Sequence, residues 1–216
     1  MSTVQATNLK HGSSASNNIV LDASGNTTIS GAATISGAAT ISGNAVVTGT
    51  LQANGVTGSV YPLVQGTAVA STSGTAIDFT GIPSWARRVT VMFNGVSTNG
   101  VSRFVVRAGT SAGVVATGYT AGSNAVGSAN STAGSAETTG FNIHQNAATD
   151  TVHGHMVLTL LSGNLWVSSH SVRVASGICA FGGGDVTLGG VLDRVRITTV
   201  GGTDTFDAGS INLLWE

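Results

Sequence analysis

The chain has 216 residues, which is enough for one ordinary domain and an appendage. Its formal net charge is −1 and only 8% of its residues are charged, which argues against a nucleic-acid-binding protein. It contains no run of about 18 apolar residues, so we expect no membrane insertion. The opening MSTVQATNLKHG lacks the apolar core of a signal peptide, so we expect none to be present.

Residues 1–22 are polar and follow no regular pattern. They come directly before a repeat, at the end of the chain where segments are ordered only when something ties them down. We therefore predict an arm that docks onto a larger body. The alternative is an arm that exchanges onto a sister chain.

A six-residue repeat fills residues 23–60, and we predict that it forms a β-stranded shaft. Six is a multiple of the strand period of two, so equivalent residues of each hexad share one face. The apolar residues that stand two places before a glycine include Ile29, Ile35, Ile41 and Val47. The glycines themselves are Gly25, Gly31, Gly37, Gly43, Gly49 and Gly55.

One chain cannot hold such a shaft alone. The four large apolar side chains bury too little surface to offset the entropy of ordering the whole segment, and strands need neighbours for their hydrogen bonds. Three chains around one axis would pair every edge and bury these side chains centrally. We therefore predict a homotrimer with a β-helical or fibrous shaft; a flexible Gly/Ser/Ala linker is the alternative.

After a linker over residues 61–76, residues 77–216 show short alternating runs between turn signals, and we predict an antiparallel β-sandwich of the jelly-roll kind. The expected strands are IDFT, RRVTVMFNG, SRFVVRAG, TTGFNIHQ, VHGHMVLTLL, NLWVSSHSVRV, GICAFGG, LDRVRITTV and SINLLWE. We expect a single helical turn in GIPSWARR, where Pro83 suits a first helical position. We expect long surface loops from Ala108 to Gly140.

Three segments resemble proteins of bacteriophage virions. FTGIPSWARRVTVMFNGVSTNG and VRITTVGGTDTFDAGSINLLWE are similar to the C-terminal module of tail-fibre-like virion proteins. NLKHGSSASNNIVLDASGNTTISG resembles the start of short virion structural proteins. The resemblance implies a trimeric virion fibre with a β-sandwich head, assembled in the host cytoplasm. It implies no catalytic residues.

His153 and His155 form an H-x-H pair whose side chains should point to one side of a strand, away from Met156. Three such pairs in a trimer would gather imidazoles that suit Fe, Zn, Cu or Ni. We favour two exposed strand histidines, with no cofactor, over this metal site. The next ligand expected nearby is absent from the sequence.

The carboxylates have simpler interpretations. We expect Asp204 and Asp207 in GTDTFDAG to cap backbone amides rather than to form a catalytic pair. Asp185 follows three glycines and is predicted to lie in a turn. Cys179, the sole cysteine, is predicted to be a small buried side chain.

The segment from Tyr119 to Ser135 is our candidate for contact with a host surface. Its small polar residues, among them Asn124 and Asn130, could adapt to a ligand while Tyr119 anchors it. The tryptophans Trp85, Trp166 and Trp215 could stack on sugars, but we expect them in the sandwich core, with Trp85 as a plug at one end.

Three functions remain open at this point. The first is a fibre that attaches a phage to a host glycan or protein. The second is a capsid decoration trimer that residues 1–22 anchor to other virion proteins, which the small number of hexads favours. The third, an enzyme, is not expected: no histidine lies between residues 12 and 143, as a hexapeptide-repeat acyltransferase would need, and the few acids are too scattered for a depolymerase.

Overall fold

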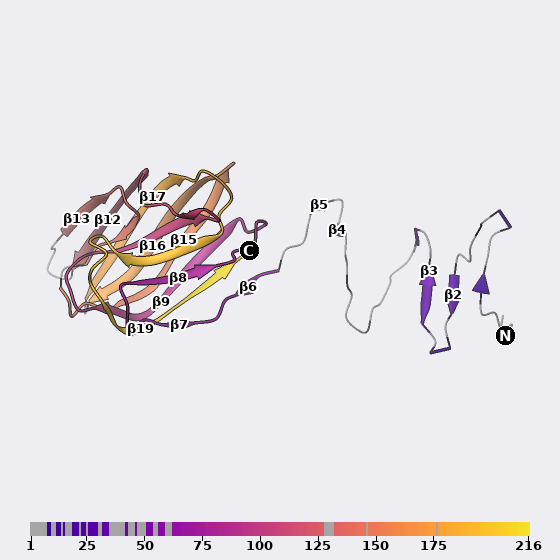
Figure 1. Cartoon of the computed structure of the whole chain (residues 1–216), viewed down its shortest axis with the longest axis horizontal. Coiled ribbons are helices and arrows are strands. Elements are labelled where there is room, and N and C mark those ends of the chain that lie inside the picture. Colours follow the sequence, from indigo (N-terminus) through magenta and orange to yellow (C-terminus); the bar gives the residue numbers. More distant parts are fainter. Residues whose placement is uncertain are drawn as a thin grey trace. The chain divides into compact units, whose positions relative to one another are not determined.

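The computed structural model describes most of the chain from residue 62 onward, except residues 128–131, 146 and 176. Before residue 62 it describes only residues 8–9, 12–13, 15, 19–21, 23–24, 26–29, 32–34, 42, 46, 51–53 and 56–58. The chain divides into two compact units, Met1–Ser59 and Val60–Glu216. The described residues form strands and no helix, so they contain no helix long and apolar enough to cross a membrane (Figure 1).

The described part of the first unit consists of two small antiparallel sheets. One joins β1 (Asn8–Leu9), β2 (Ile19–Leu21) and β3 (Thr27–Ile29); the other joins β4 (Leu51–Ala53) and β5 (Val56–Gly58). Ile19 lies opposite Ile29, so the pairing of β2 with β3 crosses the boundary that we predicted between arm and shaft. The arm and the first hexad thus belong to one sheet.

The hexad repeat is described only in part. Ile29 lies on β3 with 47% of its surface exposed. The other predicted axis residues, Ile35, Ile41 and Val47, lie outside the described residues, as do the glycines Gly25, Gly31, Gly37, Gly43, Gly49 and Gly55. The trimeric β-helical shaft therefore stays a prediction.

The described part of the second unit is a sandwich of two antiparallel sheets. The nine-stranded sheet has the order β13-β12-β17-β16-β15-β9-β19-β6, with β7 also paired to β19. These strands are β6 (Val64–Gln65), β7 (Val69–Ala70), β9 (Arg88–Thr98), β12 (Tyr119–Gly127), β13 (Thr132–Glu137), β15 (Val152–Ser162), β16 (Leu165–Ala175), β17 (Ile178–Thr187) and β19 (Phe206–Trp215).

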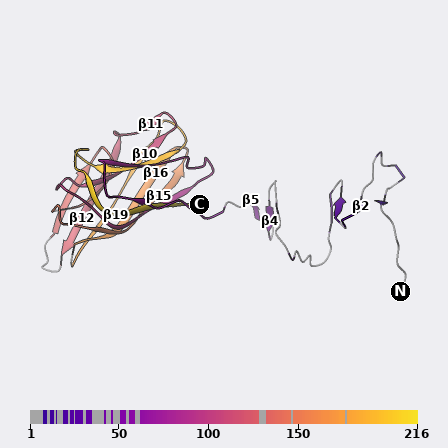
Figure 2. The ribbon, with the colours of Figure 1, turned by 60° about the horizontal axis from the view of Figure 1, so that its bottom comes forward.

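The five-stranded sheet covers one face of the larger sheet. Its order is β11-β10-β18-β8, and β14 also pairs with β10. The strands are β8 (Ala76–Thr80), β10 (Phe104–Thr110), β11 (Gly113–Val114), β14 (Phe141–Ile143) and β18 (Arg194–Thr199). Figure 2 shows this layer, with β10 and β11, over the layer that contains β15 and β16.

Strict alternation places the core between the sheets. On β16, Trp166, Val172 and Val174 are buried, whereas their neighbours Ser171 and Arg173 are exposed. Side chains at every second position of a strand share a face, so the inward positions of both sheets meet in one apolar cluster.

The two ends of the sandwich carry different parts of the chain. β6 pairs with Leu214 and Trp215, so the chain enters the sandwich beside its C-terminal residue; we call this the entry end (Figure 1). β9 begins at the entry end, because Val89 lies opposite Trp215. The strand pairings place the connections β9–β10, β14–β15, β16–β17 and β18–β19 at the opposite end, which we call the far end.

All nine predicted strands of the sandwich are confirmed, and so is the all-β class. Two predictions about the segments between them are wrong. Residues 108–140 are not long loops, because most of them belong to β10–β13. The GIPSWARR segment forms a turn rather than a helix, with Ala86 N donating to Pro83 O at 2.9 Å.

We predicted a linker over residues 61–76, but residues 62–76, which the structure describes, are part of the sandwich. They contain β6 and β7, both paired with β19. Gly66 N donates to Leu213 O at 2.8 Å, and Ser71, which is fully buried, donates from its hydroxyl to Ala208 O at 2.8 Å. This segment closes the edge of the larger sheet.

Candidate functional site

Tyr119 lies in the core rather than on a binding loop. It begins β12 with 3% of its surface exposed, and its ring meets the edge of Phe141 at 5.0 Å between centroids. Its hydroxyl accepts from Ala108 N at 2.8 Å and donates to Val115 O at 3.1 Å. Burial raises the pKa of Tyr119 to about 12. Tyr119 therefore fixes the start of β12 and is not available as a surface anchor.

The rest of the candidate contact segment is a hairpin of β12 and β13 at the edge of the larger sheet. Asn124 points outward from β12, and its side-chain oxygen occupies the space where a Cβ at Gly134 would lie, 2.2 Å away. Asn130 lies outside the described residues. Of the three residues that we singled out, Asn124 is the one that the structure shows on the surface.

The strand register brings Asn124 onto the same outer face as His155. Asn124 lies opposite Phe181, Phe181 opposite Ser171, and Ser171 opposite His155. Phe181 is 47% exposed and Val126 is 46% exposed, with Cys179 exposed opposite Val126. We call Val126, Cys179 and Phe181 the outer patch. The outer patch is a candidate contact surface.

The burial predicted for Cys179 is therefore wrong. In the apolar run GICAF, a strand could turn either Cys179 or its neighbour Ala180 toward the core. The structure buries Ala180. The turn predicted for Asp185 is also wrong, because Asp185 lies on β17 opposite Val167. Sequence periodicity could not choose between the phases, since both contain apolar residues.

The two histidines of the H-x-H pair lie on the side of β15 away from the core, and Met156 is fully buried as expected. His153 already has a partner, because its Nδ1 accepts from Gly95 N at 3.2 Å. His155 lines a shallow depression of about 230 Å³ with Met92 and Glu216. Among the described residues, no group of three or more His, Cys, Asp or Glu side chains could hold a metal ion.

The carboxylates at the far end hold its connections in place. Asp204 Oδ2 accepts from Ser102 N at 2.9 Å, which is the capping role that we predicted. Asp207 accepts from the hydroxyl of Ser97 rather than from a backbone amide. The two carboxylates thus tie the β9–β10 and β18–β19 region together (β10 begins just after Ser102).

A buried polar cluster, which the sequence analysis missed, lies on the inner face of the larger sheet. Ser123 on β12, Gly182 on β17 and His170 on β16 lie side by side in the strand register. His170 Nε2 and Ser123 Oγ are 3.0 Å apart. Their backbones are two strand spacings apart, about 10 Å in total. The imidazole can cross β17 because Gly182 has no side chain; a Cβ there would lie 2.2 Å from His170 Cε1.

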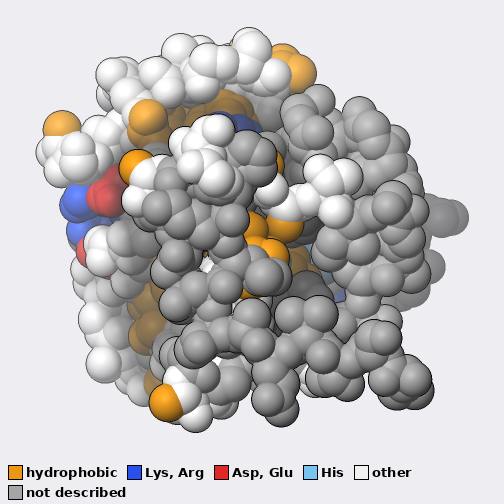
Figure 3. Space-filling model, turned by 90° about the vertical axis from the view of Figure 1, so that its right-hand side faces the viewer, with side chains coloured by type: hydrophobic (Ala, Val, Ile, Leu, Met, Phe, Trp, Pro, Cys, Tyr) orange, Lys and Arg blue, Asp and Glu red, His pale blue; other side chains and the backbone are white. Residues whose placement is uncertain are grey.

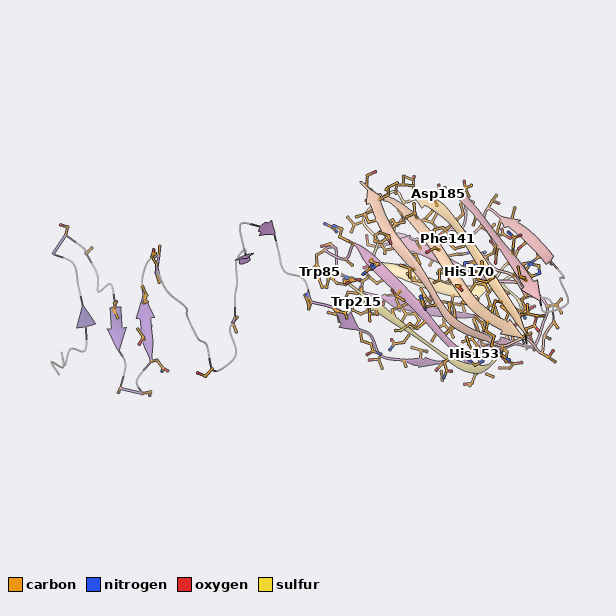
Figure 4. All side chains as sticks on the ribbon, turned by 180° about the vertical axis from the view of Figure 1, so that it is seen from behind. Trp85, Phe141, His153, His170, Asp185 and Trp215 are labelled. Carbon is orange, nitrogen blue, oxygen red and sulfur yellow. The ribbon has the colours of Figure 1, made fainter. Side chains whose placement is uncertain are left out.

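Burial determines the chemistry of this cluster. Ser123 is 1% exposed and His170 is 7% exposed, so a substrate in solution cannot reach the Ser–His pair. Ser123 Oγ also accepts from His144 N at 3.0 Å, which ties β12 to the end of β14. Burial lowers the pKa of His170 to about 4, so the ring is neutral at pH 7. We assign the cluster a structural role. Figure 4 shows the position of His170 within the larger sheet.

Two adjoining clefts of about 340 and 520 Å³ open at the entry end and share Ser84, Val191 and Leu192. Trp166 lines the smaller cleft but is only 2% exposed, so its ring offers no free face to a sugar. Trp85 and Trp215 are partly buried against the core at this end (Figure 4). The core position expected for the tryptophans is thus confirmed for Trp166, whereas Trp85 and Trp215 are only partly buried.

The chain matches no protein-family model, and no curated protein and no solved structure matches it. The candidate surfaces are therefore defined by their own geometry: the far end with its connections, and the outer patch beside it. Few charged side chains are available for recognition, because only 8% of the residues are charged. On the face in Figure 3, described basic and acidic side chains lie beside each other at the left edge.

Proposed function

We propose that this protein is a structural protein of a bacteriophage particle, a homotrimeric fibre whose jelly-roll-like heads attach to the host surface. Residues 1–22 would bind other virion proteins, and the hexad repeat would form the shaft. The head would contact a host glycan or protein. The proposal includes no catalytic step and no cofactor.

The observation that carries the proposal is the difference between the two ends of the sandwich. The chain enters at the end where β6 pairs with β19. Connections lie at both ends, and those between β9 and β10, β14 and β15, β16 and β17, and β18 and β19 lie away from the entering chain. Loops on a rigid scaffold are where recognition sites are usually found. A head that is held at one end and presents loops at the other is suited to attachment.

The repeat supports a trimer by a separate argument. Ile29 is 47% exposed within one chain, although it is a large apolar residue on a strand. Equivalent residues in sister chains could cover it around a common axis. Three heads would then bind together, and linked binding of this kind raises avidity by about 10²–10⁴ without new contacts.

Competition with phage adsorption tests the proposal. Purified full-length protein should reduce adsorption of the phage to its host cells, and Ile35→Asp, which places carboxylates in the predicted apolar seam, should compete poorly. Phe181→Ser, on the outer patch, tests whether that surface takes part. If the full-length protein binds no host cells but binds bare capsids through residues 1–22, the attachment function is wrong and a capsid decoration trimer replaces it.

A further inference from the structure

Asn94 and Gly95 occupy an irregular place in the middle of β9. Between Val152 and Gly154, a single residue of β15, His153, faces both of them. A second irregularity lies on the other side of β9, where its pairing with β19 shifts between Ala208 and Ser210. A bulge of this type leaves one residue outside the regular ladder of hydrogen bonds.

The bulge gives the N–H of Gly95 an unusual partner. Gly95 has a φ of 65°, in the left-handed region that favours glycine. Its N–H points to a side chain of the neighbouring strand β15 rather than to a backbone carbonyl of that strand. Gly95 N donates to His153 Nδ1 at 3.2 Å. This contact lies within the distance at which a side chain can act as a general base for the proton that it accepts.

Asn94, whose side chain is exposed, supplies an electrophile beside that N–H. The nitrogen of the residue that follows an asparagine can attack the side-chain amide carbon, and a following glycine offers no Cβ to hinder the attack. The attacking electron pair stands perpendicular to the peptide plane, whereas the N–H lies in the plane. His153 can therefore take the proton without blocking the approach.

We propose that His153 promotes deamidation of Asn94, which makes the Asn94–Gly95 peptide a site of spontaneous covalent modification. Gly95 N bonds to Asn94 Cγ as its proton passes to His153 Nδ1. The proton is then delivered to the side-chain nitrogen of Asn94, which leaves as ammonia; His153 is neutral again and a succinimide remains. Water then opens the ring to aspartate or isoaspartate.

The modification would change the surface slowly. A neutral side chain becomes a carboxylate beside His153, and isoaspartate adds a methylene group to the backbone of β9. Gly209 packs against this backbone so closely that its Cβ, if present, would lie 2.4 Å from Gly95 O. The inference does not depend on the proposed function.

The chain contains a matched control in Asn99–Gly100. The side-chain oxygen of Asn99 accepts from Thr205 N at 2.9 Å, and the side chain that packs against Gly100 is the carboxylate of Asp204. Trypsin releases both asparagines in one peptide, residues 89–103, because no lysine or arginine lies between Arg88 and Arg103. Both rates can thus be measured in the same sample of full-length protein by tandem mass spectrometry.

We expect Asn94 to deamidate at least about tenfold faster than Asn99 in the folded protein. This factor is smaller than the rate acceleration of about 10²–10⁴ that a fully positioned general base provides. His153→Gln keeps a hydrogen-bond acceptor but no base, and should remove most of this excess without changing Asn99. His155→Gln should leave both rates unchanged. The proposal is wrong if the excess is smaller than tenfold, or if His153→Gln leaves the Asn94 rate equal or faster.

Discussion

His170 shows how one side chain can join strands that are not neighbours. Its ring crosses β17 above Gly182 to reach Ser123 on β12, so three strands are held in one register. Gly182 is required there for space alone, since its backbone conformation is not in the left-handed region. Two consequences follow for stability, one steric and one electrostatic.

Gly182→Ala should destabilise the sandwich. The new Cβ would lie 2.2 Å from His170 Cε1 and 2.4 Å from Gly122 O, and the second contact is to backbone that cannot move aside. We expect a loss of about 2–3 kcal/mol in the free energy of unfolding, at the upper end for overpacking. Gly189→Ala is the control, because a Cβ there meets nothing within 4 Å. Equal denaturant midpoints for the two variants would contradict the account.

The buried imidazole predicts acid sensitivity. The pKa of His170 is about 4 in the folded protein and 6.5 when exposed, so the unfolded chain binds more protons between these values. The free energy of unfolding should therefore fall as the pH drops from about 6.5 to about 4, by at most about 3 kcal/mol from this residue. His170→Gln should flatten this slope relative to His155→Gln. Identical slopes in denaturant titrations across this range would show that burial does not suppress protonation of His170.

At the scale of elements, β6 and β7 form the outermost part of the larger sheet. They cover β19, and the backbone bonds from Gly66 and Ser71 tie them to it. An uncovered strand edge invites pairing with other chains. The head therefore begins near Val60 and not at residue 77, where the sequence placed it.

A fragment of residues 60–216 should be more stable than one of residues 75–216. The shorter fragment loses five described hydrogen bonds to β19. They run from Gly66 N, from Ser71 N and Oγ, from Asn212 Nδ2 to Gly66 O, and from Phe206 N to Gly74 O. At about 0.5–1.5 kcal/mol each, the loss of five bonds amounts to roughly 2.5–7.5 kcal/mol. Thermal unfolding of the two fragments checks the expectation, and coincident melting curves would mean that residues 60–74 are only a linker.

The sequence predicted those elements whose alternation is strong. On β16, large apolar residues such as Trp166 and Val172 stand at every second position, so the strand and its inward face could both be recognised. In β12 and β13 the residues are small, and neither phase dominates. Their pairing depends on the whole sheet, which a local pattern does not contain.

The candidate site was less predictable, because it depends on contacts between distant residues. His170 and Ser123 are 47 positions apart, and their contact follows from the strand order β12-β17-β16. The contact of Gly95 with His153 spans 58 positions and needs a bulge in β9. The H-x-H motif drew attention to His153 but did not indicate its contact with the N–H of Gly95, which depends on the bulge in β9.

At the scale of the whole molecule, the proposed function depends on the oligomeric state. One head offers few charged or aromatic groups for recognition, so the proposal requires three heads that act together. The predicted shaft would also need neighbouring chains, because four large apolar side chains in one chain bury too little surface to offset the entropy of ordering the repeat. A trimer satisfies both requirements.

The molar mass in solution, measured by light scattering on the full-length protein, tests this claim most directly. The account predicts three times the chain mass of 21.4 kDa, and a lower mass for Ile35→Asp, because three carboxylates would meet in an apolar seam. Ser36→Asp is the matched control, since its side chain belongs to the other face of the repeat. A wild-type mass of 21.4 kDa would contradict the trimeric shaft and, with it, attachment by three linked heads.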